Sequence, residues 1–235
     1  NIANEDFEII CINKNRTSIT TKMGLEWSAW MILRELWCNA IDEGDAIKDI
    51  GNCADINLLE GEDDRTTFFI QISDEIKQVL DNWNDYFIFK ENALFEDSNY
   101  GIYENSGKLK LYKQGVLIYQ HPELNSLFKY DIKNADINEL REFKGSIACE
   151  IFNALRNPNT DTISYFFANV KESDYEGSAM DYDWFTSFGS IWKDAIGHNR
   201  IASSSDRSYY SENGIDVDFS NVIELPKKVY SALVK

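Results

Sequence analysis

The stretch MGLEWSAWMILRELWCNAIDEGD, residues 23–45, is the longest sustained helical pattern in the chain. Its apolar residues cover more than one face of a helix, which is typical of a helix that is mostly buried. Three polar residues near its C-terminal end, Glu35, Asn39 and Asp42, lie at positions i, i+4 and i+7. A helix places residues at this spacing on one face. Because unpaired polar groups are costly to bury, this face meets either solvent or something polar that the protein binds.

The composition is that of a folded, acidic protein. The chain has 235 residues, of which 43% are hydrophobic, and a formal net charge of -17. This is enough apolar material for a packed core. A strongly negative surface repels nucleic acid and anionic membranes, and the densest basic runs are only Lys108–Lys110 with Lys113, and Lys227–Lys228. We therefore expect no direct binding of nucleic acid and no membrane association.

The cysteines and histidines also restrict the chemistry. Four cysteines are widely spaced without a C-x-x-C pair, which indicates free thiols in a reducing cytoplasm. No signal peptide and no apolar run of about 18 residues is visible, so we expect a cytoplasmic protein. The two histidines, His121 and His198, both fall in expected loops. Neither a zinc site nor histidine-dependent catalysis is expected.

The apolar periodicity predicts an α+β fold with strands first and helices later. The predicted strands cover residues 7–12, 17–20, 54–59, 65–73, 108–112, 116–120, 127–132 and 222–225, and the predicted helices cover 23–45, 75–87, 137–155, 161–171, 183–196 and 227–235. Residues 88–105 have an irregular pattern, and the Ser-rich residues 202–213 predict a loop. A boundary near residue 157 would separate a domain of residues 1–157 from a mainly helical extension, 158–235. The connection is short enough that the two can form one continuous domain.

The segment Arg34–Asp42, RELWCNAID, resembles the N-box of the GHKL ATPase superfamily. That superfamily includes gyrase-type topoisomerases, heat-shock chaperones of the ninety-kilodalton class, histidine kinases and MutL-type mismatch-repair proteins. Its pattern is Glu-x-x-x-Asn-Ala-x-Asp-Ala, and the positions in register here are Glu35, Asn39, Ala40 and Asp42, with Glu43 in place of the last Ala. Residues 33–36, LREL, are especially similar to the chaperone version. The resemblance implies a two-layer α/β sandwich with a mainly antiparallel sheet and helices on one face.

The resemblance also implies a role for each polar residue of the helix, with ATP and Mg²⁺ as ligands. Glu35 would be the general base that activates a water for attack on the γ-phosphate. Asn39 would ligate the magnesium ion, which needs few protein oxygens because phosphates and waters supply the rest. Asp42 would contact the nucleotide. The alternative is an amphipathic helix with a solvated polar edge.

Two further motifs of the superfamily are not evident. The Asp-x-Gly-x-Gly motif that reads adenine is absent, and at its expected place Asp74 is either an adenine acceptor or the N-cap of the next helix. The nearest candidate for the phosphate-binding loop is residues 141–146, REFKGS, where phosphate contacts would come from Arg141, Lys144, Gly145 and Ser146. Because the helical pattern continues through Gly145, the alternative there is an ordinary solvated helix face.

Two functions are therefore compatible with the sequence. The first is an ATP-binding protein with slow magnesium-dependent hydrolysis that drives a conformational change or dimerisation. The second is a non-catalytic interaction or assembly protein, for instance a viral one, that retains the ATPase fold. The missing Asp-x-Gly-x-Gly motif and the charge of -17 favour the second. Both imply a protein partner or a homodimer.

Overall fold

The structure of the chain is a computed structural model. It describes residues 9–12, 15–20, 27–42, 70–88, 93–138, 140–180, 188, 190–196, 200–203, 205–206, 209, 212–213 and 222–234. The chain divides into two compact units, Asn1–Trp83 and Asn84–Lys235. Within the described residues, no helix is long and apolar enough to cross a membrane.

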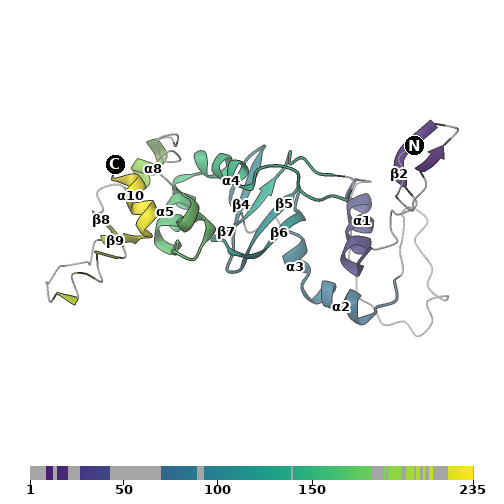
Figure 1. The fold of residues 1–235 in the computed structure, drawn as a ribbon, viewed down its shortest axis with the longest axis horizontal. Coiled ribbons are helices and arrows are strands. Elements are labelled where there is room, and N and C mark those ends of the chain that lie inside the picture. Colours follow the sequence, from purple (N-terminus) through teal and green to yellow (C-terminus); the bar gives the residue numbers. More distant parts are fainter. Residues whose placement is uncertain are drawn as a thin grey trace, which may run out of the picture. The chain divides into compact units, whose positions relative to one another are not determined.

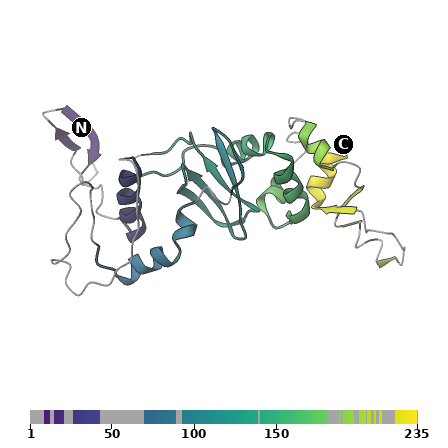
Figure 2. The ribbon, with the colours of Figure 1, turned by 180° about the vertical axis from the view of Figure 1, so that it is seen from behind.

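The first unit contains a β-hairpin and the helices around the opening motif. Strands β1 (Ile9–Ile12) and β2 (Asn15–Thr20) pair antiparallel, which confirms the two predicted N-terminal strands. Helix α1 (Ala29–Asp42) confirms the predicted long helix over these residues and contacts α2 (Asp74–Asp81), as Figure 2 shows in purple and blue. The ring of Trp37 on α1 meets that of Trp83, at the start of α3 (Trp83–Tyr86), edge-on at 4.9 Å.

Two details before α2 differ from the sequence prediction. The predicted strand 54–59 and residues 65–69 of the next one lie outside the described residues, but residues 70–73 form no strand. The N-cap of α2 is Ser73 rather than Asp74, because Ser73 has extended backbone angles and its Oγ accepts the N–H of Ile76 at 3.3 Å. Asp74 is instead the first residue of the helix.

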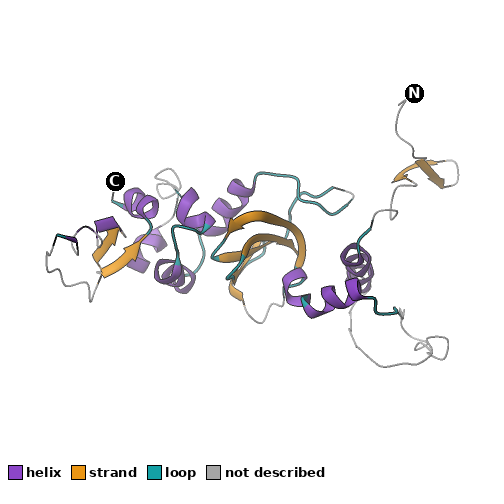
Figure 3. Ribbon diagram, turned by 60° about the horizontal axis from the view of Figure 1, so that its bottom comes forward, coloured by secondary structure: helices purple, strands orange, loops and turns teal. Residues whose placement is uncertain are grey.

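The second unit is built on a five-stranded mixed sheet (Figures 1 and 3). Its strands are β3 (Ala93–Glu96), β4 (Tyr100–Glu104), β5 (Lys108–Lys113), β6 (Val116–Asn125) and β7 (Phe128–Ile132). The spatial order is β3-β4-β7-β5-β6, and β5 and β7 form the one parallel pair in this sheet. The fold class is therefore α+β, as predicted.

The turns of this sheet explain one confirmed prediction and one that was wrong. The predicted hairpin around residue 114 is present, with left-handed backbone at Gln114 (φ 50°) and Gly115 (φ 82°), as a tight hairpin turn requires. Residues 88–105, predicted to be irregular, contain β3 and β4. Asp97 makes the turn between them, because its Oδ1 accepts the N–H groups of Asn99 and Tyr100, both at 2.7 Å.

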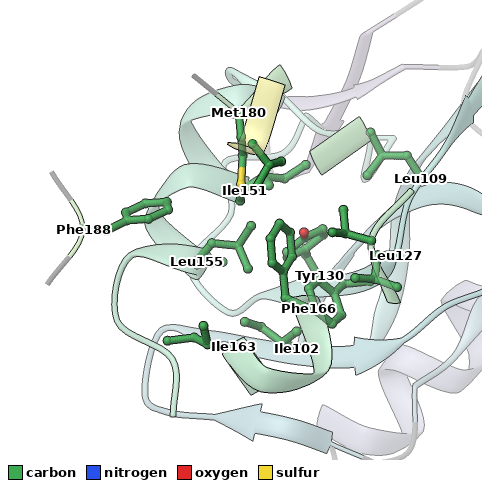
Figure 4. Close-up of a cluster of buried hydrophobic side chains, with 14 of the residues drawn as sticks. Ile102, Leu109, Leu127, Tyr130, Ile151, Leu155, Ile163, Phe166, Met180 and Phe188 are labelled. Atoms are coloured by element: carbon green, nitrogen blue, oxygen red, sulfur yellow. The ribbon is translucent and has the colours of Figure 1, made fainter. Parts of the chain in front are cut away.

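The described residues after the sheet contain five helices and two short strands. They are α4 (Ile147–Arg156), α5 (Thr160–Asn169), α6 (Tyr175–Ala179), α8 (Ser190–Ile196) and α10 (Lys227–Leu233), with strands β8 (Arg200–Ser203) and β9 (Val222–Leu225) paired parallel. One hydrophobic core joins a face of the sheet to α4 and α5; Figure 4 shows Ile102 and Tyr130 of the sheet facing Leu155 and Phe166. The core thus continues on both sides of residue 157.

Two predictions about this region were wrong. The helix predicted over 137–155 begins only at Ile147, with Ser146 as its N-cap. The Ser-rich segment is not wholly a loop, because its first residues, Ala202 and Ser203, belong to β8. The predicted helices over 161–171 and 227–235 and the strand over 222–225 are confirmed in their described parts.

Candidate functional site

Helix α1 has one buried side and one open side. Leu33, Arg34 and Cys38 are buried, whereas Ile32 is 44% exposed and Asn39 is also exposed. Glu35 is half-buried and lies between these two exposed residues along the helix. Because positions 32, 35 and 39 are spaced by three and four residues, they share one side of the helix. Glu35 and Asn39 therefore lie along an edge of the helix that a ligand or solvent can reach.

Glu35 is held by its neighbour in the sequence. Arg34 donates hydrogen bonds from Nε and a terminal guanidinium nitrogen to Oε1 of Glu35, at 3.2 and 3.1 Å. Only 4% of Arg34 is exposed, and its guanidinium carbon lies 5.9 Å from the centre of the Trp30 ring. The carboxylate that the resemblance makes a general base is therefore already an acceptor for a buried arginine.

Helical spacing does not predict that Arg34 is the partner of Glu35. Successive residues on a helix point about 100° apart, so an i,i+1 pair is not expected to meet from spacing alone. The signal that could have indicated it is chemical. An arginine on the buried side of an apolar helix must find an acceptor, and Glu35 is the nearest carboxylate in the sequence.

The other two acidic candidates of the first unit lie at helix ends. Asp42 is the last residue of α1, and its side chain is outside the described part of the structure. Asp74 is exposed in the first turn of α2, where its negative charge stabilises the helix dipole. Since Ser73 provides the cap, the carboxylate of Asp74 is not committed to that role.

The candidate phosphate loop is a tight turn and not part of a helix. Asn138 closes the turn: its carbonyl accepts the N–H of Arg141 at 2.9 Å, and its Oδ1 accepts the N–H of Glu142 at 2.8 Å. Arg141 has φ of 57°, a left-handed conformation that costs free energy for a residue with a side chain. A strained arginine at the tip of a turn is a feature that often accompanies binding sites.

The residues that follow lead into helix α4. Lys144 is exposed, and its N–H donates to the carbonyl of Asp136 at 2.8 Å. At Gly145, an added Cβ would come within 2.8 Å of the end of the Phe143 ring, so the lack of a side chain permits this contact. The Oγ of Ser146 accepts the N–H of Cys149 at 3.3 Å. The sequence prediction of a continuous helix missed this Gly-Ser pair as a helix start.

Some groups around the start of α4 attract an anion, and one group repels it. The exposed N-terminus of α4 and the Lys144 ammonium attract negative charge. Glu150, in the first turn, opposes it, and its Oε2 accepts a hydrogen bond from the Tyr100 hydroxyl at 3.1 Å. The Ser146 hydroxyl is already engaged as the cap. This start of α4 would therefore hold a phosphate through Lys144 and backbone N–H groups more than through side-chain hydroxyls.

The candidate residues form two groups that belong to different units. The group of the first unit is Glu35, Asn39, Asp42 and Asp74, and the group of the second unit is Arg141, Lys144, Gly145 and Ser146. An exposed amide oxygen on Asn39 fits magnesium, which prefers hard oxygen ligands and usually takes only one or two from the protein. Among the described residues, no three His, Cys, Asp or Glu side chains are grouped to hold a metal ion by themselves.

Comparison with known proteins adds no relative. The chain matches no protein-family model, and neither a curated protein sequence nor a solved structure shows significant similarity to it.

Proposed function

We propose that the chain is an ATP-binding protein of the GHKL type, with slow magnesium-dependent hydrolysis coupled to a conformational change or dimerisation. The observation that carries the proposal is the placement of Glu35 and Asn39 one turn apart on the open side of α1, whose other side is buried. The proposal includes the sandwich architecture of that superfamily, with α1 as the helix that carries the catalytic residues.

The proposed roles follow the chemistry of the side chains. Asn39 holds the magnesium ion through its amide oxygen, and Asp42 contacts the nucleotide. Glu35 orients the attacking water and takes its proton, which requires that it exchange at least part of its contact with Arg34. Bound magnesium would neutralise charge on the phosphates as the γ-phosphoryl group leaves.

The proposal assigns one further nucleotide contact on the first unit and a separate phosphate-binding segment on the second. Asp74 accepts a hydrogen bond from the adenine amino group, in the place of the missing Asp-x-Gly-x-Gly motif. On the second unit, the residues that would bind a phosphate group are Lys144, the amides of Gly145 and Ser146, and Arg141 at the tip of its turn. What supports these assignments is that Asp74 is exposed and not used as a cap, and that the residues around Gly145 begin a helix.

Calorimetric titration with ATP and magnesium tests the proposal directly. Wild type is expected to bind, and Asn39→Ala is expected to weaken binding at least about tenfold by removing the metal ligand. Glu35→Gln should bind ATP normally and lose turnover. Gln78→Ala, which removes an exposed amide from α2, is the matched control and should do neither. Lack of nucleotide binding by wild type at millimolar ATP would contradict the proposal.

The second candidate function is a non-catalytic interaction protein that keeps this fold. The Arg34–Glu35 contact favours it, because Oε1 of Glu35 already accepts two hydrogen bonds from Arg34 and is occupied in the structure. In that case Glu35→Gln and Asn39→Ala should leave partner binding unchanged. A pull-down with both variants separates the two functions, since loss of partner capture in either variant would argue against the second.

A further inference from the structure

The sheet of the second unit has a charged face opposite its hydrophobic core. Leu109, Leu111, Phe128 and Tyr130 point into the core. Because side chains alternate along a strand, Lys110 on β5 and Lys129 on β7 lie on the other face. These two lysines are also register partners in the parallel pair β5/β7. Two ammonium groups are therefore neighbours on the two central strands of an otherwise acidic protein.

Asp85 pairs with Lys110 and acts on Lys129 only through its charge. Lys110 is only 7% exposed, and its Nζ lies 2.7 Å from Oδ1 of Asp85. Lys129 is half-buried, and within the described part of the chain its ammonium has one hydrogen bond, a long one of 3.4 Å to the carbonyl of Asn84. Partial burial, and then the charge of Lys110, lower the pKa of Lys129, while Asp85 acts in the opposite direction.

The same row of the sheet continues with a tyrosine on one side and a glutamine on the other. Tyr103 on β4 is the register partner of Lys129, and Gln120 on β6 is that of Lys110. Tyr112, two residues along β5, lies on the same face, but its hydroxyl is used on the carbonyl of Asp85 at 2.8 Å. The Tyr103 hydroxyl lies over Gly101 and not beside Lys129, so the exposed Gln120 is the neutral donor of this row next to the two ammonium groups.

A partly desolvated ammonium beside a second positive charge is stabilised by a negative ligand. We propose that Lys110 and Lys129 form an anion-binding site on this face of the sheet, which takes the phosphate or carboxylate group of a small molecule. The anion bridges the two ammonium groups, completes the hydrogen bonding of Lys129 and competes with Asp85 for Lys110. This site stands on the second unit alone, so it does not depend on nucleotide binding at α1.

Residue-specific acylation of the wild-type protein tests the site. An amine-selective acyl ester reacts with the neutral amine, so in chloride buffer Lys129 is expected to label faster than an ordinary lysine. A bound anion covers Lys129 and favours its charged form. At about 10 mM inorganic phosphate and constant ionic strength, we expect labelling of Lys129 to fall at least roughly threefold. The exposed Lys171 is the internal control, and its labelling should not change.

Succinate in place of phosphate distinguishes the two ligand classes. Protection by phosphate alone assigns a phosphate site, and equal protection by both assigns a site for carboxylates as well. The charge variants give an independent readout by calorimetry with phosphate: Lys129→Gln should abolish the heat of binding, whereas Asp85→Asn should tighten binding by removing the competing carboxylate. Equal labelling of Lys129 in chloride, phosphate and succinate would overturn the proposal, and so would equal phosphate affinity in wild type and Lys129→Gln.

Discussion

The hydroxyl of Tyr130 donates a hydrogen bond of 2.6 Å to Oε1 of Glu176, and both side chains are fully buried. Ser126 donates to the same oxygen at 2.6 Å, and the backbone N–H of Leu127 donates to Oε2 at 3.0 Å. Glu176 lies on α6, whereas Tyr130 lies in the middle of β7 and Ser126 and Leu127 come just before that strand. This carboxylate therefore fastens the helical part of the second unit to its sheet.

Removal of this carboxylate should strongly destabilise the second unit. Glu176→Ala leaves a cavity and takes the acceptor from two buried donors, the Tyr130 hydroxyl and the Leu127 N–H, whereas Ser126 can still donate to the carbonyl of Phe128 at 2.8 Å. We therefore expect a loss of roughly 3–5 kcal/mol in the free energy of unfolding. Glu176→Gln should cost less, roughly 1–3 kcal/mol, because its carbonyl can still accept the N–H of Leu127, which cannot rotate away. Urea unfolding followed by hydrogen exchange in β7 measures the order wild type, Gln, Ala. A Gln variant as unstable as the Ala variant would contradict this order and show that a side chain of the same shape with one acceptor oxygen does not replace the carboxylate.

The same residue predicts a pH dependence of stability. Burial raises the pKa of Glu176 above its ordinary value of 4.5, although hydrogen bonds from Ser126 and Tyr130 oppose the shift. Above the ordinary value the folded state holds this proton more tightly than the unfolded state, so stability decreases as pH rises toward the raised pKa. The stability of wild type relative to Glu176→Gln should therefore fall as pH rises from 4.5. If the stability of wild type minus that of Glu176→Gln instead rises with pH, the assignment of a raised pKa to Glu176 is contradicted.

The sheet of the second unit shows what sequence patterns can and cannot predict. The hairpin at Gln114 and Gly115 was predictable, because apolar alternation and turn residues act over a few neighbours. The pairing of Lys110 with Lys129 was not, since it depends on β7 inserting between β4 and β5. That order is set by how the whole core packs, which no local pattern encodes.

The candidate site shows the same division. The spacing of Glu35 and Asn39 is a local property of the sequence, and both residues lie on helix α1 as this spacing predicts. The start of α4 at Ile147 depends on the turn that Asn138 closes and on the cap at Ser146, which compete with helix propensity over residues 137–145. Polar side chains that bond to the backbone outweigh the apolar periodicity there, so the predicted helix was too long.

Two glycines of the second unit should respond differently to an added methyl group. At Gly177 on α6 a Cβ would lie 2.1 Å from the carbonyl oxygen of Lys171, and that backbone cannot move without displacing α6. At Gly145 the close atom is the end of the Phe143 ring, which can rotate. We expect Gly177→Ala to cost roughly 3 kcal/mol and Gly145→Ala roughly 1 kcal/mol or less. Denaturant unfolding of both variants measures the difference, and equal costs would contradict it.

The hairpin turn between β5 and β6 offers a stabilising change. Gln114 adopts a left-handed backbone at φ 50°, which asparagine tolerates better than glutamine, and Gly115 follows it at φ 82°. Gln114→Asn creates the favoured Asn-Gly sequence and should stabilise the second unit by about 0.5 kcal/mol. Gly115→Ala is the opposite control and should destabilise it, because a Cβ there is strained and also approaches the Ile88 carbonyl at 3.1 Å. A destabilised Gln114→Asn variant would mean that Gln114 makes side-chain contacts that matter more than its backbone.

The contact between Arg34 and Glu35 can be measured with a double-mutant cycle. Because Arg34 is buried and Glu35 is only partly exposed, we expect a coupling of about 1 kcal/mol between Arg34→Met and Glu35→Gln in the stability of the first unit. The same variants probe the proposed mechanism. If Glu35 must leave Arg34 to activate water, Arg34→Met should raise the ATP turnover rate per bound nucleotide while it lowers stability. Turnover that falls in parallel with stability would instead assign Arg34 a positioning role, since the loss would then follow the misplacement of Glu35.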